Sequence, residues 1–329
     1  MPLLTIFTPA YNRKHTICRT YESLLRQTDK DFQWLIIDDG STDGTKDWVT
    51  SLGDGVWKNH LTYDWMGCKT TEESKHCLYS VDIESGTNCI HIDYIYKPNG
   101  GLYTGYNVAF DHIDTELCVC IDSDDYLPDN AVETIKSVWE RLSQDDKNTI
   151  GGIAGLDYDV TNGQPLGGNY SVSDTVAWVQ SLRHNADSKF VFQTKLIRQY
   201  APQLGFDGEK DFNPHYMQMQ LFDKYPMFII NENLCWVEYQ IGGDSMSQAI
   251  FKQYRRSPRS FAKYRLMELR MTKGVSLSRR FSLAAHYISA CIFSRDRQWL
   301  SNSQDKALVI LAIPLGILYN LLIRYKTRK

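Results

Sequence analysis

The chain has 329 residues, of which 43% are apolar and 23% are charged, and its formal net charge is −3. These values are typical of globular proteins, and they exclude a disordered tail, a collagen and a small disulfide scaffold. At roughly 150 residues per domain, the length predicts about two domains.

The small net charge hides a strong division along the chain. Residues 251–329 contain 17 Lys and Arg but only three acidic residues, so they carry a net charge of +14 and residues 1–250 carry −17. Such a division indicates a partner with negative charge, namely nucleic acid, an anionic membrane surface or a phosphorylated ligand.

The apolar residues of the first 150 positions alternate between strand and helix spacing. We expect strands at residues 3–8, 32–37, 90–96 and 117–121. Apolar residues at helical spacing predict helices between these strands, and Pro128 opens a further helix. This alternation is typical of a parallel α/β sheet.

Two regions depart from this rhythm. Residues 55–89 are polar and show no sustained period, so we expect an insertion, for which a hairpin on the rim of the sheet is one candidate form. Residues 151–240 predict a helix around 175–182 and strands at 227–231 and 235–239.

Polar residues gather where the four predicted strands end. In an open α/β sheet, ligands bind beyond the carboxyl ends of the strands. The strand ends of this chain are Thr8–Asn12, Asp38–Ser41, Lys97–Gly101 and Asp122–Asp125. We therefore expect carboxylates and glycines from distant parts of the chain to meet at one ligand-binding edge.

The last of these segments predicts a metal site. Asp122, Asp124 and Asp125 place three carboxylates within four residues, and their mutual repulsion costs stability unless a cation compensates it. Hard oxygen ligands suit Mn²⁺ or Mg²⁺, which would neutralise the charge on a leaving diphosphate. The alternative is an acidic helix N-terminus that complements the dipole of the helix after Pro128.

Four segments, taken in order, resemble the family 2 glycosyltransferases. They read Thr-Pro-x-Tyr-Asn at 8–12, Asp-Asp-Gly-Ser-Thr-Asp at 38–43, Asn-Gly-Gly at 99–101 and Asp-Ser-Asp-Asp at 122–125. The resemblance covers residues 1 to about 135. It implies an α/β fold of the GT-A type, which is a Rossmann-like nucleotide-diphospho-sugar transferase fold.

The resemblance also implies how the chain is divided. A GT-A catalytic domain would cover residues 1–240, with a nucleotide-sugar-binding half at 1–135 and an acceptor half at 136–240. A helical, basic and membrane-associating region would follow at 241–329.

Residue roles follow from the same resemblance. The base and ribose pocket would be lined by Thr8, Pro9, Ala10 and Tyr11. The nucleotide would be bordered by Asn99, Gly100, Gly101 and Asn107, where the glycines allow close backbone approach. Asp39 would accept the imide N–H of uracil, Asp124 would reach the ribose or the metal, and Asp125 would hold the metal.

One departure from the family concerns the base. The family often has Ala-Arg-Asn in the helix after the third strand, where this chain reads Gly105-Tyr106-Asn107. The usual cation near the base is therefore missing, and Lys97 is a candidate to replace it, unless the base is held differently.

An inverting sugar transfer also needs a carboxylate that deprotonates the acceptor hydroxyl. The resemblance places this base near a helix start in the acceptor half, and residues 206–212, Phe-Asp-Gly-Glu-Lys-Asp-Phe, match best. We expect Glu209 to be this base, with Asp211 and then Asp207 as the next candidates. The alternative is that the segment is a solvated loop with a chance run of acids. Residues 242–247 predict either a mobile loop that closes over the diphosphate or a plain linker.

The end of the chain predicts a membrane anchor over residues 307–329. Residues 307–323 read ALVILAIPLGILYNLLI, and six mostly basic residues follow. As a helix this run would span about 25 Å, short of a hydrocarbon core of roughly 30 Å. We expect it to lie in the cytoplasmic leaflet with its cations on anionic head groups. A short span, or a helix buried in a homodimer or in the core, are the alternatives.

Together these features predict a metal-dependent, inverting glycosyltransferase of cell-surface polysaccharide synthesis. It would move a hexosyl or N-acetylhexosaminyl group from a UDP-sugar to a glycan acceptor, such as one linked to polyprenyl diphosphate. The alternative is a non-catalytic nucleotide-sugar-binding or scaffolding subunit of a glycan assembly complex. We expect no nucleic-acid partner, because the apolar run beside the basic residues fits lipid better.

The cysteines and the first residues of the chain bear on where the protein is located. The eight cysteines form no CxxC pair, and Cys118 and Cys120 lie in an apolar run that predicts buried thiols. The first residues form a strand-like run without a signal-type pattern, so we expect a peripheral protein at the cytoplasmic face of the cell membrane.

Overall fold

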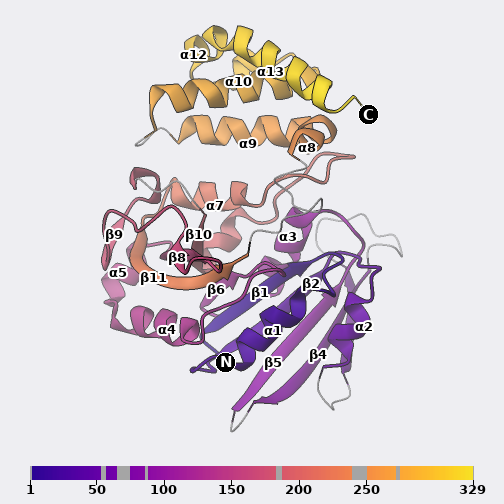
Figure 1. Cartoon of the computed structure of the whole chain (residues 1–329), viewed down its shortest axis with the longest axis vertical. Helices are drawn as coiled ribbons and strands as arrows, with labels where there is room; N and C mark the ends of the chain where they lie inside the picture. The colour runs from indigo at the N-terminus through magenta and orange to yellow at the C-terminus, as the bar shows by residue number, and fades with distance from the viewer. Residues whose placement is uncertain are drawn as a thin grey trace.

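The structure is a computed structural model that describes residues 2–52, 57–64, 75–85, 88–182, 187–238, 250–271 and 275–328. It consists of a sheet with helices on both faces and, beyond one end of it, a layer of helices from the C-terminal part of the chain (Figure 1).

The strands of the sheet are, in chain order, β1 Leu4–Ala10, β2 Phe32–Asp38, β3 Lys58–Asp64, β4 Lys75–Ser85, β5 Asn88–Tyr96, β6 Leu117–Cys120, β7 Gly152–Asp159, β8 Gln164–Pro165, β9 Thr175–Ala177, β10 Ser188–Gln193 and β11 Met227–Val237. In space their order is β3-β4-β5-β2-β1-β6-β10-β7-β11-β9, with β8 paired to β7.

The four strands predicted from the sequence form the parallel centre of this sheet. β5, β2, β1 and β6 lie side by side and run parallel. Every residue of β1 is buried, as are six of the seven residues of β2. Near-continuous burial along a strand is typical of parallel strands that are covered on both faces. The prediction of a parallel α/β core is therefore confirmed.

The insertion expected at residues 55–89 extends one edge of the sheet. β3 pairs antiparallel with β4, and β4 pairs antiparallel with β5. The described part of the insertion is thus a hairpin on the rim, which was one form that the sequence allowed. Its polar composition fits a sheet edge, where one face of each strand meets water.

The second half of the sheet corrects one prediction. Residues 175–182 do not form the expected α-helix, because Thr175–Ala177 is strand β9 and Val179–Ser181 is a short 3₁₀ turn. Thr175 and Val176 are β-branched, and β9 pairs antiparallel with β11. The two strands expected at 227–231 and 235–239 are one strand, β11, with register shifts in its middle.

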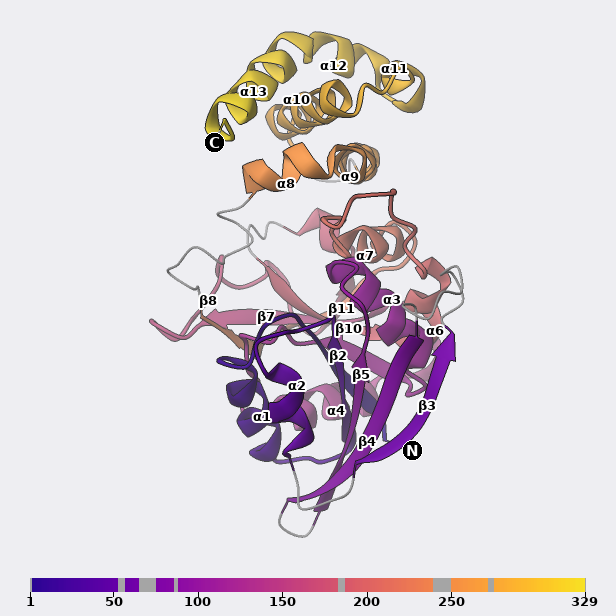
Figure 2. The same cartoon turned by 90° about the vertical axis from the view of Figure 1, so that its right-hand side faces the viewer.

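The helices beside the sheet are α1 Ile17–Leu25, α2 Thr45–Thr50, α3 Leu102–His112, α4 Ala131–Arg141, α5 Gln144–Thr149, α6 Thr194–Ile197 and α7 His215–Phe222. Side chains of α1, α2 and α4 share one apolar core with the sheet, and those of α3, α6 and α7 share the core on the other face. Figure 2 shows α3 and α7 on the side that is turned toward the C-terminal helices.

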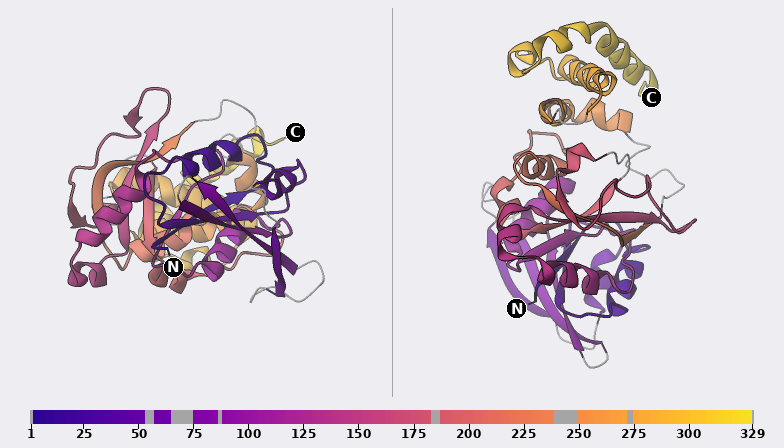
Figure 3. Two further views of the ribbon diagram at one scale, coloured as in Figure 1. Left: turned by 90° about the horizontal axis from the view of Figure 1, so that it is seen from below. Right: turned by 90° about the vertical axis from the view of Figure 1, so that its left-hand side faces the viewer.

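The C-terminal helices are α8 Ile250–Arg256, α9 Pro258–Arg270, α10 Leu277–Ser294, α11 Trp299–Asn302, α12 Lys306–Leu311 and α13 Ile313–Lys326. We call them the helical module. They pack around a core of their own, which includes Tyr254, Phe261, Tyr287 and Ile323. The module lies beyond α7, and α9 is its helix that packs against α7 (right-hand view of Figure 3).

The apolar run at residues 307–323 is divided between two helices of this module. α12 ends at Leu311, and α13 begins at Ile313 with Pro314 in its first turn. Pro is favoured there because its missing N–H has no helical acceptor to lose. Among the described residues, no helix combines the length and the apolar character that crossing a membrane requires.

Candidate active site

The carboxyl ends of β1 and β2 are joined by two short polar contacts. The backbone N–H of Asn12 donates to Ser41 Oγ at 2.8 Å, and the Asn12 side chain accepts from the N–H of Thr42 at 2.8 Å. Asn12 has a φ of +55°, a left-handed conformation that Asn tolerates better than most residues. Asp38 is fully buried and accepts from Ser41 N–H and Tyr94 Oη at 2.7 Å each, so its role is structural.

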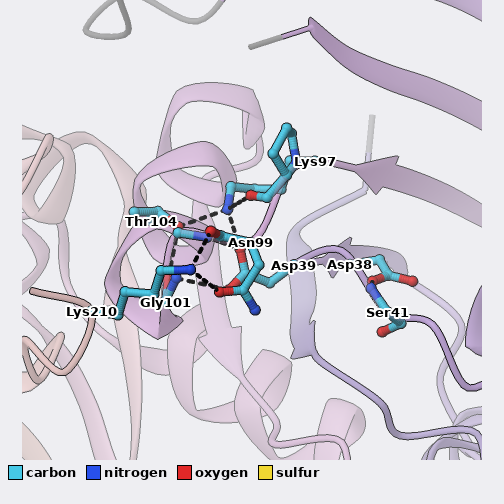
Figure 4. A network of polar contacts seen from close by, with 10 residues as sticks. Asp38, Asp39, Ser41, Lys97, Asn99, Gly101, Thr104 and Lys210 are labelled. Atoms are coloured by element: carbon cyan, nitrogen blue, oxygen red, sulfur yellow. Dashed lines mark hydrogen bonds and ion pairs between the residues drawn. The ribbon is translucent and has the colours of Figure 1, made fainter. Parts of the chain in front are cut away.

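Asp39 is the centre of a network at the ends of β2 and β5 (Figure 4). Its carboxylate accepts from Lys97 Nζ, and also from the N–H groups of Gly100 and Gly101 at 2.9 Å each. A carboxylate can accept about four hydrogen bonds, so these three donors leave room for one more. The network therefore orders the glycine pair and still permits Asp39 to receive a base N–H.

Lys97 is the cation that the sequence suggested for this region. Its side chain is buried, and besides Asp39 it donates to Pro98 O at 2.9 Å and Thr104 Oγ1 at 2.7 Å. Gly101 has a φ of +93°, a conformation that favours glycine. These contacts fix the segment 97–101, which we call the glycine loop.

Most of the other residues expected around the nucleotide are buried, and one of them, Tyr11, is exposed. Thr8 is buried and accepts from Trp34 Nε1 at 3.0 Å, and Ala10 is buried with its carbonyl accepting from the N–H of Asp39 at 2.8 Å. Pro9 is likewise buried, whereas Tyr11 is exposed. The Asn107 amide is used on both sides by the backbone of Gln203, at 2.7 and 3.0 Å. Of this set, Tyr11 presents the most surface at the strand end.

The turn after β6 carries the predicted metal-binding residues. Its backbone is closed by a 3.0 Å bond from the N–H of Asp125 to Asp122 O. Helix α1 holds it from behind, since Thr20 Oγ1 donates to Asp125 O at 2.7 Å and Arg19 donates to Asp124 O at 3.3 Å. Asp125 is buried, Asp124 is half-buried and Asp122 is exposed. We call residues 122–125 the acidic turn.

The electrostatics of the acidic turn involve two residues that the sequence did not reveal. Lys189 on β10 and Asp157 on β7 are buried beside it, with Lys189 Nζ 3.7 Å from Asp157 Oδ1. Burial raises the pKa of Asp125 to about 8, and the neighbouring carboxylates add to this shift while Lys189 opposes it. Burial also raises the pKa of Asp157 to about 6. A single lysine and a single aspartate in separate strands carry no local signal, so sequence reasoning missed them.

The acidic turn suits a hard cation in the chemistry of its carboxylate side chains. In the described part of the chain, no group of three or more His, Cys, Asp or Glu side chains is arranged to hold a metal ion. The set Asp122, Asp124 and Asp125 therefore stays a prediction from the sequence. Mg²⁺ is often bound by only one or two carboxylates together with waters and substrate phosphates, and the crowded oxygen donors of this turn fit that arrangement.

The segment expected to hold the catalytic base lies against the glycine loop. The Lys210 side chain donates to Asn99 O at 3.0 Å and to Asn99 Oδ1 at 2.9 Å. Gly101 lies so close to this segment that an added Cβ would collide with the carbonyl oxygen of Lys210. The structure thus brings the acids of residues 207–211 to the same edge as Asp39.

The three acids of this segment have different surroundings. Glu209 is buried and accepts four hydrogen bonds from Arg259 and Ser260, at 2.7 to 3.1 Å. Asp211 accepts from Arg256 and from Ser257 Oγ. Asp207 is exposed, and within the described residues no hydrogen bond to its carboxylate is present. The expected closing loop at 242–247 lies outside the described residues.

Comparison with known proteins shows which proteins the first part of the chain resembles. Residues 5–65 match the family model described as Glycosyl transferase family 2. The chain is 46% identical over 84 residues to the UDP-Glc:alpha-D-GlcNAc-diphosphoundecaprenol beta-1,3-glucosyltransferase WfaP of Escherichia coli, which covers 25% of this chain and 31% of that protein. It is 30% identical over 133 residues to chondroitin synthase of Pasteurella multocida, which covers 40% of this chain and 10% of that protein. The matches thus span a tenth to a third of these relatives.

Solved structures agree with this result at the level of the fold. The structure of S. aureus TarS 1-349 in complex with UDP-GlcNAc has a TM-score of 0.56 and 15% sequence identity, and the match covers 100% of this chain and 92% of that one. Another S. aureus TarS structure has a TM-score of 0.57 and 14% identity, and covers 99% of this chain and 55% of that one. The resemblance predicted from four short segments is confirmed for residues 5–65, which match the family 2 glycosyltransferase model, and the chain as a whole shares the fold of the TarS structures.

Proposed function

We propose that this chain transfers a sugar from a UDP-sugar to a glycan acceptor carried on a polyprenyl diphosphate, with inversion at the anomeric carbon. The observation that carries the proposal is the position of the acidic turn. It follows β6, which is a direct neighbour of β1 in the sheet, and Asp39 and the glycine loop follow β2 and β5 on the same side of the parallel strands. Ligands of open α/β sheets bind at this edge.

The donor would be held by groups that the fold has already fixed. The glycine loop is ordered by Asp39 and Lys97, and a fixed backbone of this kind loses little entropy when a nucleotide binds. Asp39 has one acceptor position left, which suits the imide N–H of uracil. The complex of TarS with UDP-GlcNAc supports a UDP-sugar as the donor class.

Metal dependence belongs to the same proposal. Asp124 and Asp125 would hold Mn²⁺ or Mg²⁺, with Asp122 near enough in sequence to bind through water. When bound, the ion would offset the negative charge of the diphosphate. Burial raises the pKa of Asp125 and its acidic neighbours add to this shift, so a bound cation would stabilise the charged form of this carboxylate.

We place the base in the segment 207–211, and the contacts there favour Asp207. Each of the two acids first expected for this role is engaged by donors of the helical module, Glu209 by Arg259 and Ser260 and Asp211 by Arg256 and Ser257. A carboxylate whose oxygens are already occupied by donors has less capacity to accept the hydrogen of an acceptor hydroxyl. In the proposed step, Asp207 takes the proton of the acceptor hydroxyl, the hydroxyl oxygen bonds to the anomeric carbon, and the bond from that carbon to the diphosphate breaks.

The membrane surface is proposed as the place where the acceptor is met. α12 and α13 expose a row of large apolar side chains, of which Leu311, Leu318 and Tyr325 are 68%, 63% and 71% exposed. Arg324, Lys326 and Arg328 follow at the end of the chain. A face of this composition suits the interface of an anionic bilayer. The helices form the outermost layer of the molecule, at the end opposite the sheet (Figure 1).

The experiment that tests the proposal combines the purified chain with UDP-glucose, UDP-N-acetylglucosamine and GDP-mannose, with and without Mn²⁺. We expect metal-dependent release of UDP from one of the two UDP-sugars when a polyprenyl-diphosphate-linked glycan is present. Binding of a UDP-sugar without any turnover would leave the non-catalytic subunit as the better description. Activity with GDP-mannose alone would contradict the donor class.

A further inference from the structure

Three consecutive residues, Glu209, Lys210 and Asp211, connect the helical module to the glycine loop. Here the two acids contact the start of the module, and the lysine between them contacts Asn99. We call residues 209–211 the strap.

Glu209 caps helix α9 from a distant part of the chain. α9 begins at Pro258, and the residue before it, Ser257, makes no side-chain cap to its own helix. The Glu209 carboxylate accepts instead from the N–H groups of Arg259 at 3.1 Å and Ser260 at 2.8 Å. These are among the first N–H groups of the helix, which have no acceptor within it, and the negative charge also suits the positive end of the helix dipole.

Asp211 secures the same helix start by a second set of bonds. Its N–H donates to Ser257 Oγ at 3.2 Å, and Ser257 Oγ donates in turn to the Asp211 carboxylate at 2.7 Å. Ser257 is fully buried, and Arg256 pairs with the same carboxylate. The strap is therefore attached to the module at both of its ends.

Lys210 attaches the middle of the strap to the glycine loop. Its ammonium group is bound to both oxygens of Asn99, and its carbonyl oxygen lies against the Cα of Gly101. The loop is thus held from one side by Asp39 and from the other by Lys210, as Figure 4 shows. Lys210 itself is exposed, and an exposed pair contributes little to the stability of the fold.

We propose that Lys210 is a positioning residue for the donor, and that the strap transmits the placement of the helical module to the glycine loop. A module that is docked on a membrane would then hold the loop in the geometry that binds the nucleotide-sugar. The consequence for donor binding depends on the proposed function, whereas the mechanical link between module and loop does not. Because Lys210 adds little to stability, its effect on the loop is separable from an effect on folding.

The test compares the wild-type chain with the variants K210A and K210R and with K195A, in which another exposed lysine, on α6, is removed. Amide hydrogen exchange of the glycine loop is measured first, because it requires no substrate. We expect exchange at Gly100 and Gly101 to be about fivefold faster in K210A, on the scale of the net contribution of one ordinary hydrogen bond. K210R and K195A should remain within about twofold of the wild type, and the melting temperature should be unchanged in all four proteins.

Titration calorimetry with UDP in the presence of Mn²⁺ then measures the effect on the donor. K210A should bind UDP about fivefold more weakly, and K210R should restore most of the affinity. Equal exchange and equal UDP affinity in K210A and the wild type would overturn the inference. If the wild type binds no nucleotide, the proposed function is wrong, and the exchange measurement alone still decides whether Lys210 orders the loop.

A second variant examines the link to the module. E209Q replaces an acceptor of two backbone N–H groups by an amide that can satisfy only one of them. We expect faster exchange both at the start of α9 and at Gly100 and Gly101, roughly threefold at each place. Faster exchange at α9 with an unchanged glycine loop would show that the strap does not couple the two.

Discussion

Lys97 donates to the carboxylate of Asp39, and the two side chains are only 5% and 9% exposed. This ion pair joins the ends of two strands that lie far apart in the sequence, and it stands next to the N–H groups of Gly100 and Gly101. A buried charge that loses its partner is costly, since water cannot replace it. The pair therefore both stabilises the sheet edge and sets the charge that a nucleotide meets there.

The first prediction concerns this pair. K97M leaves the Asp39 carboxylate buried without its cation and should lower the free energy of unfolding by about 3 kcal/mol. Urea denaturation measures this value, with K195A as the control for loss of an exposed lysine. A double variant, K97M with D39N, should be less destabilised than the sum of the single variants, because neither charge is then left alone. Additive effects would contradict a direct pairing.

The second prediction concerns the base. D207N should lower kcat by at least about 100-fold without changing the melting temperature, since the Asp207 carboxylate is exposed and general-base catalysis contributes on this scale. E209Q and D211N should each lower the melting temperature and change kcat by less than about tenfold. Steady-state kinetics and thermal unfolding distinguish these outcomes. A larger kcat loss in E209Q than in D207N would return the role to Glu209.

The third prediction concerns the acidic turn. D125N should lower kcat/KM by at least about 100-fold, because it removes a carboxylate that would hold the cation facing the diphosphate. D129N is the matched control, since Asp129 lies four residues away and makes an exposed pair with Arg26. UDP affinity measured without metal should be similar in both variants. Full activity in D125N would remove the proposed role of the turn.

The fourth prediction concerns the exposed face of α12 and α13. L318E places a charge in the middle of this face and should weaken binding to phosphatidylserine vesicles at least tenfold, about the contribution of one buried leucine. S301E adds the same charge on α11, at an exposed position outside the apolar row, and should bind like the wild type apart from a small charge effect. Cosedimentation gives both values. Equal loss in the two variants would show that net charge, and not the apolar face, governs binding.

The fifth prediction concerns pH and is independent of the reaction. Hydrogen bonds to Asp93 and Asp82 raise the pKa of His91 to about 9, from 6.5 in the unfolded chain, although burial opposes the shift. The folded state therefore binds a proton that the unfolded state releases, and stability falls as pH rises from about 6.5 to 9. In H91Q the melting temperature should change less over this range. A steeper decline in H91Q than in the wild type would contradict the assignment.

The parallel core of the fold was predictable because its strands are buried on both faces. Leu4–Ala10 and Phe32–Asp38 are mostly apolar, and such runs carry their own signal in the sequence. The sequence signal of residues 175–182 was weaker. Their apolar spacing resembled a helix, but pairing of Thr175 and Val176 with β11 decides their structure. Tertiary contacts of this kind override local preference.

The part of the candidate site that lies at strand ends was also predictable from the sequence. Asp39, the glycine loop and the acidic turn stand at strand ends, where topology alone brings them together. Residues of α8 and α9 bind Glu209 and Asp211, which lie more than forty positions away in the sequence. No local spacing of residues predicts these contacts. The buried pair of Lys189 and Asp157 is hidden for the same reason. Both features depend on how distant segments pack, and neither follows from periodicity.

The central claim is that the acidic turn works together with a divalent ion on the diphosphate of a UDP-sugar. Its most direct test is calorimetric titration of UDP into the wild type and D125N, each with and without Mn²⁺. We predict that Mn²⁺ tightens UDP binding to the wild type at least tenfold and has little effect on UDP binding to D125N. Loss of even an outer-shell partner of a metal ligand weakens metal binding by about tenfold or more. Equal tightening in the two proteins, or none in the wild type, would contradict the claim.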